Sequence, residues 1–522
     1  MSGILGIDLG TTNSAAAILE QGAPLVLPMS DGRYTLPSVV ALREGHILVG
    51  EKAKRQSISN ATNTVFAAKR LMGRSFADPQ TQRAIDAMPF TCIGGLTGDV
   101  RILLGGKPLA VEEVSALVLA TIRKAAEQHL DREIRRAVIT CPAYFNDRQR
   151  QATRDAGAIA GLDVIQVVNE PTAAALAHGF HQGAERRVVV YDLGGGTFDV
   201  SVLKVGGGAV EVLATAGDAF LGGHDFDNRI FDWLVAELGA KHGVNVAEDP
   251  DVSQRLREAA EAAKIRLSDA PRTNIAIPFL TTLPNGDPLH LDATLDRTLY
   301  ESLVSDLIER SVGLFRDTIT AAGLTPADVQ EVLMVGGMTF TPAVRARVQE
   351  LVPCPPSAGV HPDLVVAVGA AVQAGLLTSD SSASVLVDVT PHNLGLLTVA
   401  GLAETVIPRN TRVPTKVQKR FATVSDGQQV VKLVVYQGDS RKIAQNEVLG
   451  EFFLEGLRPA PRGEVAVDVT FAIGVDGAVA VTALDVETGK AKEFRAVRGT
   501  AKPEGELAEM LTRHQQLLLT VV

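Results

Sequence analysis

The sequence is poor in cysteine, in aromatic residues and in excess positive charge. Only three cysteines occur in 522 residues, and no two form a CxxC pair, which excludes a disulfide framework and favours a reducing compartment. Aromatic residues make up 4% of the chain, with one tryptophan, which argues against an aromatic platform for single-stranded nucleic acid. Lys and Arg number 50 against 60 Asp and Glu, which argues against a general binder of nucleic acid or anionic membranes.

Targeting segments, spanning segments and the commonest nucleotide-binding motif are also missing. Residues 1–8 include an acidic residue and no basic region, so no signal peptide is predicted. No apolar run reaches about 18 residues, so no spanning helix is predicted. No GxxxxGKS or GxxxxGKT run occurs, which excludes a P-loop enzyme. We therefore expect a cytoplasmic protein that binds neither a membrane nor nucleic acid.

The pattern along the chain predicts two structural classes in succession. The composition, with 46% apolar and 21% charged residues, is that of a folded protein of about three to four domains. Strand-like and helix-like segments alternate up to residue 378, which favours an α/β fold. Beyond a polar stretch, apolar and polar residues alternate with hairpin turns, as in a β-sandwich. We expect an α/β domain over 1–378, a linker over 379–389, a β-sandwich over 390–497 and a short tail with helical spacing over 498–522.

Two loops share a pattern that suits phosphate binding. Each follows a strand with Asp, and then with glycines whose bare amides can approach phosphate oxygens closely. Thr hydroxyls add hydrogen-bond donors, and the Asp can hold hydrated Mg²⁺. One such loop is usually only a tight turn, but a third Gly-Gly element after another strand makes a phosphate site the better interpretation. The loop residues are Asp8, Gly10, Thr11, Thr12, Asn13, Asp192, Gly194, Gly195, Gly196, Thr197, Gly336 and Gly337.

Longer motifs give the sequence a specific resemblance. They include IDLGTTNSA over 7–15, AAKRLMGR over 67–74, NEPTAAALAH over 169–178 and YDLGGGTFDVSV over 191–202. On these stretches the chain resembles the seventy-kilodalton heat-shock chaperones, the DnaK family, within the actin and hexokinase superfold. The resemblance extends from residue 4 to about residue 497. It implies an actin-like two-lobed ATPase domain joined by a linker to an all-β sandwich that binds unfolded or extended polypeptides.

The resemblance also assigns catalytic roles. It implies that Lys69 orients the attacking water and contacts the γ-phosphate of ATP, and that Glu170 polarises this water. Thr197 would lie near the γ-phosphate. The reaction would be Mg²⁺-assisted phosphoryl transfer to water that yields ADP. The residues that would organise Mg²⁺, its waters and K⁺ are Asp8, Asp192 and Asp199.

The predicted adenosine site combines helix spacing with two departures from the family. Glu261, Lys264 and Ser268 are spaced i, i+3 and i+7, so they share one helix face. They match ribose and adenine contacts of the family, as do Gly336, Gly337 and Asp363. Phe340 stands where the family usually has arginine, and Ile265 where some members have a second arginine. We expect adenine to lie between these two side chains, with Phe340 as a core residue as the alternative.

The resemblance implies coupling between the domains. Pro142 matches the switch proline of the family, and Arg150 matches the arginine that relays the switch. The apolar run from Ser384 to Asp388 makes sense as a strand that alternately docks on the ATPase domain and leaves it. For all but Val399 and Val424, a place in the sandwich core is the alternative to a place in the groove. The residues that map to the peptide groove of the family are Leu396, Val399, Phe421, Val424, Val431 and Leu433.

Further departures concern partners and the lid. A J-domain co-chaperone and a nucleotide exchange factor are the partners the family implies, but Gln166 replaces an arginine involved in J-domain docking. His224 stands where the family often has Glu, and we expect it to contact the other lobe. Only 498–522 follows the sandwich, in place of a helical lid, and we expect the apolar end of this tail to lie against the sandwich. The alternatives are an actin-like ATPase or a kinase without chaperone activity.

Overall fold

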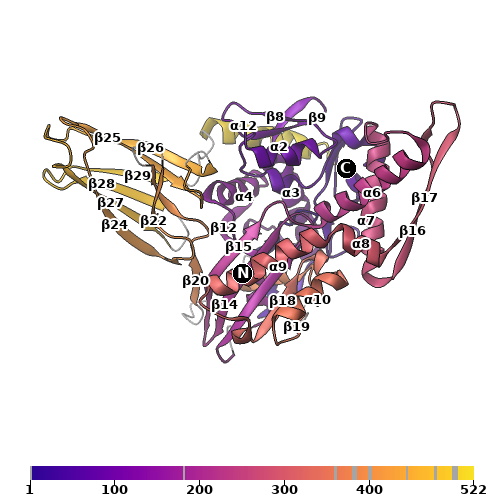
Figure 1. Ribbon diagram of the computed structural model, residues 1–522, viewed down its shortest axis with the longest axis horizontal. Helices are drawn as coiled ribbons and strands as arrows, with labels where there is room; N and C mark the ends of the chain where they lie inside the picture. The colour runs from indigo at the N-terminus through magenta and orange to yellow at the C-terminus, as the bar shows by residue number, and fades with distance from the viewer. Residues whose placement is uncertain are drawn as a thin grey trace.

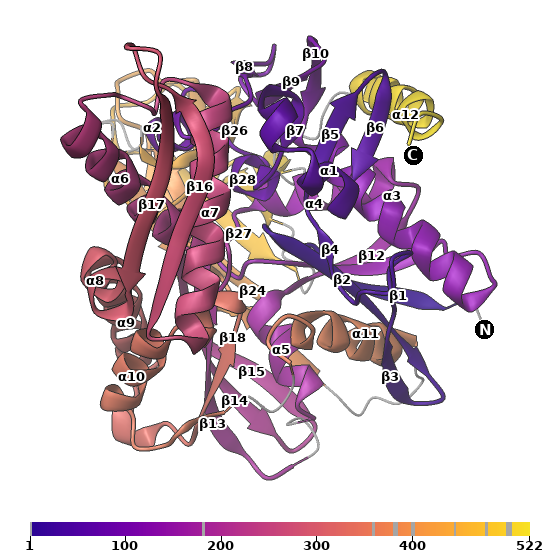
Figure 2. The same ribbon diagram turned by 90° about the vertical axis from the view of Figure 1, so that its right-hand side faces the viewer.

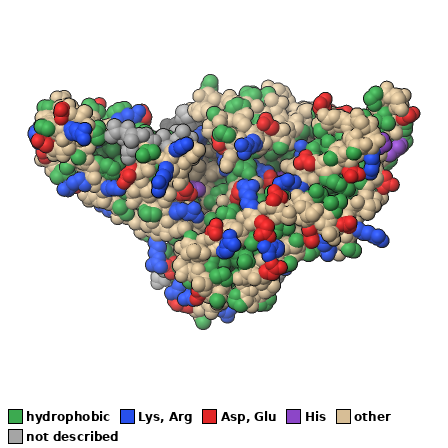
Figure 3. All heavy atoms as spheres, in the orientation of Figure 1, with side chains coloured by type: hydrophobic (Ala, Val, Ile, Leu, Met, Phe, Trp, Pro, Cys, Tyr) green, Lys and Arg blue, Asp and Glu red, His purple; other side chains and the backbone are tan. Residues whose placement is uncertain are grey.

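The protein has a two-lobed α/β body and a separate β-sandwich, which lie side by side in Figure 1. The computed structural model describes residues 3–179, 183–357, 361–378, 385–397, 402–442, 445–474, 479–496 and 504–521. Within these ranges no helix is long and apolar enough to cross a membrane. On the face drawn in Figure 3, the described Lys and Arg side chains are interspersed with Asp and Glu. The α/β fold followed by a β-sandwich confirms the predicted fold class.

Lobe I, residues 3–179 together with α11 (Val365–Thr378), is built on a mixed sheet. In spatial order its strands are β12 (Asp163–Asn169), β11 (Arg136–Cys141), β1 (Ile4–Asp8), β2 (Asn13–Glu20) and β3 (Ala23–Val26), and β4 (Leu36–Pro37) also pairs with β2. Strands β1, β11 and β12 are mutually parallel, whereas β2 is antiparallel to β1. The carboxyl ends of the three parallel strands therefore meet at one edge, where Asp8 and Glu170 lie.

Helices and small sheets cover the lobe I sheet. The helices α5 (Glu170–Ala177) and α11 pack together and against β11, and α11 also packs against β1. The helices α3 (Val111–Leu130) and α4 (Asp147–Ile159) also pack together. The remaining elements are α1 (Glu51–Arg55), η1 (Ile58–Asn63), η2 (Ala68–Leu71), α2 (Pro79–Asp86), β5 (Val40–Arg43), β6 (His46–Val49), β7 (Thr64–Val65), β8 (Cys92–Gly94), β9 (Val100–Leu104) and β10 (Lys107–Ala110).

Lobe II, residues 183–357, has its own sheet. Its strands in spatial order are β19 (Pro356–Ser357), β18 (Glu331–Val335), β13 (Arg186–Leu193), β14 (Phe198–Gly206) and β15 (Ala209–Asp218). Because β13 and β18 are parallel, Asp192 and Gly336 come to one edge, as Asp8 and Glu170 do in lobe I. The helices of this lobe are α6 (Gly223–His242), α7 (Pro250–Asp269), α8 (Arg297–Leu303), α9 (Ser305–Ala321) and α10 (Pro342–Leu351), and its short turns are η4 (Pro326–Asp328) and η5 (Gly337–Phe340). Strands β16 (Arg272–Thr282) and β17 (Pro288–Asp296) form a hairpin that projects at the right of Figure 1.

The linker is docked on lobe II as an added strand. Strand β20 (Val385–Val389) pairs in parallel with β15, with Leu386 opposite Val210. The sandwich strand β23 (Arg412–Val413) pairs with the other side of β20. This pairing covers the exposed edge of the lobe II sheet and makes one continuous sheet from the body into the sandwich.

The sandwich consists of two antiparallel sheets around a core of alternating apolar residues. One sheet has the order β22 (Ala403–Ile407), β21 (Leu394–Leu397), β25 (Val430–Gln437), β26 (Glu447–Glu455). The other has the order β24 (Thr415–Ala422), β27 (Ala466–Ile473), β28 (Val479–Asp485), β29 (Ala491–Ala496). Val469, Phe471 and Val481 are fully buried between the sheets. Period-2 alternation is what a two-layer sandwich requires, because successive side chains point to opposite faces.

The C-terminal tail packs on lobe I, so the expectation that its apolar end lies against the sandwich is wrong. Helix α12 (Glu504–Leu518) lies beside α3 and α4, and Figure 2 shows it next to β5 and β6. Met510 is fully buried in the lobe I core. Arg513 donates two hydrogen bonds to the buried Glu113 carboxylate, at 2.6 and 2.7 Å, and Ile47 N donates to Thr520 O. These contacts make the tail part of lobe I.

The buried His514 makes this docking sensitive to pH. Its ring is 1% exposed, and neither ring nitrogen has a hydrogen-bond partner among the described residues. Burial, with a smaller effect of Arg123, lowers the pKa of His514 from 6.5 to about 4. Because the folded pKa lies below the unfolded one, docking is strongest above pH 6.5 and loses up to about 3 kcal/mol as the pH falls toward 4.

We predict that amide hydrogen exchange in residues 504–521 accelerates as the pH falls from 7 to 5, after correction for the intrinsic exchange rate. His514→Leu, which cannot be protonated, should remove most of this dependence. An identical pH profile in the wild type and in His514→Leu would contradict the prediction.

Candidate active site

A cavity of about 510 Å³ lies between the two lobes, at the strand edges where the predicted phosphate loops meet. Nearly all of the predicted nucleotide residues line it. The structure thus brings together Asp8, Gly10, Thr11, Thr12, Asn13, Lys69, Glu170, Asp192, Gly194, Gly195, Thr197, Glu261, Lys264, Ser268, Gly336, Gly337, Phe340 and Asp363. Gly196 and Asp199 lie behind this lining. Asp199 is fully buried, and the Gly196 carbonyl accepts a hydrogen bond from Arg70 Nε at 2.8 Å.

Glycine is required where the loops of the two lobes touch. A Cβ at Gly195 would overlap the Thr12 hydroxyl of the opposite loop. Gly336 has φ of +83°, and a Cβ there would overlap the Leu193 carbonyl. Only glycine tolerates both the positive φ and the close backbone approach. Gly195 therefore allows the loops of the two lobes to touch, and Gly336 allows two loops within lobe II to lie close together at the cavity.

Lys69 and Glu170 form a buried ion pair at the bottom of the cavity. The Lys69 Nζ lies 2.5 Å from Glu170 Oε1, and the two residues are 5% and 6% exposed. Burial alone would lower the pKa of Lys69, but the nearby Glu170 and Asp8 carboxylates outweigh it and raise the pKa above its ordinary value. The lysine therefore remains a cation. Such a pair is held in place because either partner alone would be a costly buried charge.

Three further buried carboxylates surround this pair. Burial, reinforced by the charge of Glu170, raises the pKa of Asp8 to about 7. The same two causes raise the pKa values of Asp192 and Asp199 well above the ordinary range. Asp192 and Asp199 lie directly opposite each other on β13 and β14. The cluster is therefore short of positive charge, and a cation would stabilise its ionised form.

The donor set fits a hydrated Mg²⁺ ion rather than a directly bound metal. Among the described residues, no group of three or more His, Cys, Asp or Glu side chains is close enough to hold a metal ion by itself. The Asp199 Oδ2 atom is buried without a hydrogen-bond partner, and Thr140 Oγ1 donates to Asp8 Oδ1 at 3.2 Å. Mg²⁺ usually keeps several of its waters and uses few carboxylates. Asp8 and Asp192 line the cavity and present acceptors suited to such waters, and Asp199 lies fully buried behind them.

Two apolar side chains line the predicted adenosine end of the cavity. Ile265, on α7, is 58% exposed and Phe340, on η5, is 42% exposed, and both line the cavity. Phe340 is thus not a core residue. Lys264 Nζ lies 2.8 Å from Asp227 Oδ1 on α6, and Glu261 pairs with Lys54 of lobe I at 3.0 Å.

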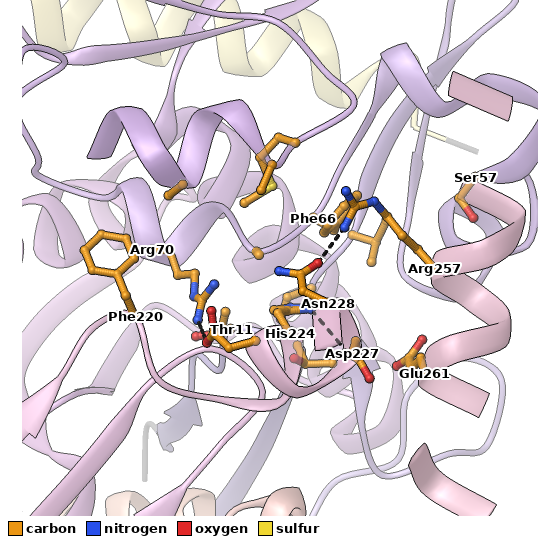
Figure 4. A pocket seen from close by; sticks show the side chains of 18 of the residues that line it. Thr11, Ser57, Phe66, Arg70, Phe220, His224, Asp227, Asn228, Arg257 and Glu261 are labelled. Carbon is orange, nitrogen blue, oxygen red and sulfur yellow. Dashed lines mark hydrogen bonds and ion pairs between the residues drawn. The ribbon is translucent and has the colours of Figure 1, made fainter. Parts of the chain in front are cut away.

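Sequence reasoning missed several residues that connect the lobes. Arg70, next to Lys69 in a quoted motif, is 6% exposed, pairs with Asp225 and binds the Gly196 carbonyl. Its position beside a predicted catalytic lysine was the available signal. The His224 ring lies 6.0 Å from that of Phe66, which confirms the expected contact between the lobes, and Figure 4 shows both side chains together with Arg70.

A continuous set of hydrogen bonds runs from the cavity to the linker. The Ala143 amide donates to Asp199 Oδ1 at 2.8 Å. Arg150 Nη2 donates to the Ala143 carbonyl at 3.0 Å and to Asn169 Oδ1 at 2.6 Å. Asn169 Nδ2 in turn donates to Asp388 Oδ2 at 2.7 Å. The sequence named Arg150 and Asp388 but missed Asn169, which lies within the motif over 169–178.

The segment after Pro142 also contacts the sandwich. Pro142 is buried at the end of β11 and precedes Ala143. The next residue, Tyr144, accepts a hydrogen bond at its carbonyl from His392 Nε2 at 2.8 Å. The Asp147 amide donates to Gln437 Oε1 at 3.1 Å. The predicted switch segment therefore lies between the charged cavity and the sandwich.

The predicted groove residues differ in their surroundings. Leu396 and Leu433 are 2% and 5% exposed in the sandwich core. Phe421 and Val431 are half-buried against that core. Val424 is 47% exposed, and Val399 lies outside the described residues. Leu396 and Leu433 thus take the core position that the sequence left as an alternative.

One comparison with known proteins bears on the whole chain. A family model described as Hsp70 protein matches residues 4–519. The match includes both lobes, the linker, the sandwich and nearly all of the tail. The chain therefore belongs to the Hsp70 protein family, a family of ATP-binding chaperones.

Proposed function

We propose that this protein hydrolyses ATP to ADP and uses the nucleotide state to control the binding and release of extended apolar segments of unfolded proteins. The observation that carries the proposal is the hydrogen-bonded connection between the charged cavity and a docked linker. It joins Asp199, beside the Lys69–Glu170 pair, to Asp388 of the linker through Arg150 and Asn169. An ATPase or kinase without chaperone activity would have no use for this connection to a sandwich.

The cavity residues account for the chemistry of hydrolysis. Amides and hydroxyls of the loops around Thr12 and Thr197 would bind the phosphates. Asp8, Asp192 and Asp199 would hold hydrated Mg²⁺, with K⁺ beside it, and these cations would offset phosphate charge. Lys69 would contact the γ-phosphate and stabilise charge that develops on it. Glu170, oriented by Lys69 at 2.5 Å, would accept a hydrogen bond from the attacking water. Positioning and charge neutralisation supply most of the rate in such reactions.

Lys69→Ala should remove most of the hydrolysis and leave ATP binding measurable, because the cation acts mainly in the transition state. We expect the single-turnover rate to fall by about 100-fold, with ATP affinity followed by calorimetry. The matched control is Lys52→Ala, which removes an exposed lysine on α1 outside the cavity. Wild-type turnover in Lys69→Ala would refute the assignment.

Coupling would act through the linker. ATP would favour the state in which β20 is docked on β15, and ADP would favour it less. A ligand shifts such an equilibrium only by the difference in its affinity for the two states. Loss of the γ-phosphate would change the surroundings of Asp199 and, through Ala143 and Arg150, the hydrogen bond to Asp388. The sandwich contacts at His392 and Gln437 would be released with the linker.

The family implies partners in addition to unfolded polypeptides. A J-domain co-chaperone would be expected to bind near the docked linker, and a nucleotide exchange factor on the ATPase lobes. Gln166, the departure from the J-domain arginine, accepts a hydrogen bond from Gln373 Nε2 at 2.9 Å and lines a cavity that also contains Asp388 and Leu386. A J-domain for this protein would therefore need to recognise an uncharged side chain at this position.

The docked tail supports an open peptide groove. Helix α12 has its apolar face on lobe I, with Met510 buried and Arg513 paired with Glu113. In this position it does not cover the sandwich. A lid mainly slows dissociation, and affinity differences between related complexes lie mostly in the off-rate. We therefore propose weak, rapidly exchanging peptide binding.

In stopped-flow measurements, a fluorescent apolar peptide should leave the ADP form within seconds. Arg513→Ala, which weakens the attachment of α12 to lobe I, should leave the release rate unchanged because the helix does not hold the peptide. Release over many minutes, or a rate that changes with Arg513→Ala, would mean that the tail acts as a latch.

A further inference from the structure

Helix α12 is attached to lobe I near both of its ends. Near its start, Glu506 forms an ion pair with Arg101 of β9. Just after its end, the Thr520 carbonyl accepts a hydrogen bond from Ile47 N of β6 at 3.0 Å. The helix is therefore held to lobe I along its whole length, including the turn that follows the segment from the sandwich.

The middle of α12 is fixed by burial and by charge. Met510 and His514, one turn apart, are 0% and 1% exposed, and Leu517 packs against the lobe I core on the same side. Residues spaced in this way form one face of a helix. Arg513 pairs with Glu113, whose side chain is completely buried. If α12 left lobe I, this carboxylate would lose its cation while still surrounded by protein, which is strongly unfavourable.

Only a short segment joins this helix to the sandwich. Strand β29 ends at Ala496 and α12 begins at Glu504, so the seven residues 497–503 separate them. The eight steps between these two Cα atoms span at most about 29 Å when the chain is fully extended. In Figure 1, one end of α12 lies at the side of the body that faces the sandwich. While α12 stays docked, the end of β29 must remain within that distance of lobe I.

The other connection between sandwich and body is the linker. Helix α11 ends at Thr378, and β20 is docked on β15 with Leu386 opposite Val210. If β20 left β15, the chain from Thr378 to Thr390 could extend to about 43 Å. A sandwich held only by this linker could turn in any direction. With α12 docked, it is held both before its first strand and after its last one.

Direct contacts of the sandwich with the α4 region of lobe I are polar. Arg148 of α4 lies 3.3 Å from Glu447 of β26, and the two side chains are 19% and 28% exposed. His392 Nε2 lies 2.8 Å from the Tyr144 carbonyl. Contacts of this kind contribute little when water can replace them. They would not hold the sandwich beside lobe I after β20 had left.

We propose that α12 is an anchor and that residues 497–503 are a short tether, which together keep the sandwich beside lobe I when the linker strand leaves lobe II. The observation that carries the proposal is a helix fixed near both ends and joined to the sandwich by only seven residues. The tether would limit the volume that β20 can reach and so raise its effective concentration at β15. Under the proposed function, the ADP state would remain compact; the tether itself does not depend on that function.

The test measures the distance distribution between two spin labels in the full chain. The labels are attached at Lys124→Cys on α3 and Lys492→Cys on β29, which are both exposed positions. Cys354→Ser removes the partly exposed native thiol, whereas Cys92 and Cys141 are buried.

A release variant makes the linker strand leave without any nucleotide. It combines Leu386→Asp with Val389→Asp, because both side chains pack in the same apolar cluster. Loss of hydrogen-exchange protection in residues 385–389 verifies that β20 has left β15. We expect the distance distribution of this variant to be at most about twofold wider than that of the wild type, because the tether still limits the sandwich.

Lengthening the tether should remove this restraint. About 20 Gly and Ser residues inserted between residues 499 and 500 raise the maximum reach to about 100 Å. In the release variant this insertion should widen the distribution at least threefold. The matched control is the same insertion between Asn285 and Gly286, in the exposed turn of the β16–β17 hairpin, which should leave the distribution narrow.

Three results would overturn the proposal. The release variant could be as wide without the insertion as with it, it could stay narrow with the insertion, or the control insertion could widen it equally. A further variant locates the anchor. Met510→Asp with Arg513→Glu should free α12 and widen the distribution of the release variant as the insertion does, and a narrow distribution there would also overturn the proposal. ATP hydrolysis that ignores unfolded polypeptide would contradict the proposed function but would leave these distances unchanged.

Discussion

The structure depends on the burial of several negative charges at the junction of the two lobes. Glu170 pairs with Lys69, and Asp8, Asp192 and Asp199, at the ends of β1 and β13 and the start of β14, lie near enough to interact with its charge. Burial and mutual repulsion raise the pKa values of the three aspartates. A cation that binds between the lobes would therefore stabilise the ionised carboxylates. A hydrated Mg²⁺ ion with a nucleotide would do so. In the proposed function this constraint would link lobe closure to the state of the nucleotide, since the charged residues belong to both lobes.

The linker extends this constraint to the sandwich. An exposed apolar strand between domains would be prone to aggregate, but β20 pairs with the open edge of the lobe II sheet and is itself covered by β23. The pairing is specific because Asp388 accepts a hydrogen bond from Asn169 beside the charged cavity. In the proposed function, a change at Asp199 would therefore bias whether β20 is docked.

Local sequence patterns predicted the site better than they predicted contacts between distant segments. The Asp-Leu-Gly loops could be recognised because their chemistry lies within a few consecutive residues, and parallel pairing then brought them together. The position of α12 could not be predicted. Its pattern defines an apolar face but not the surface that covers it, and the deciding partner, Glu113, is 400 residues away. Likewise, alternation in the sandwich could not tell whether Leu396 faces the core or a groove.

We propose that the nucleotide site and a polypeptide site are coupled. The most direct measurement is single-turnover ATP hydrolysis by the full chain, with and without a permanently unfolded polypeptide, and with a folded protein of similar size as the control. We expect faster hydrolysis with the unfolded polypeptide and no change with the folded protein. A hydrolysis rate unaffected by saturating unfolded polypeptide would contradict it and would leave an ATPase without chaperone coupling.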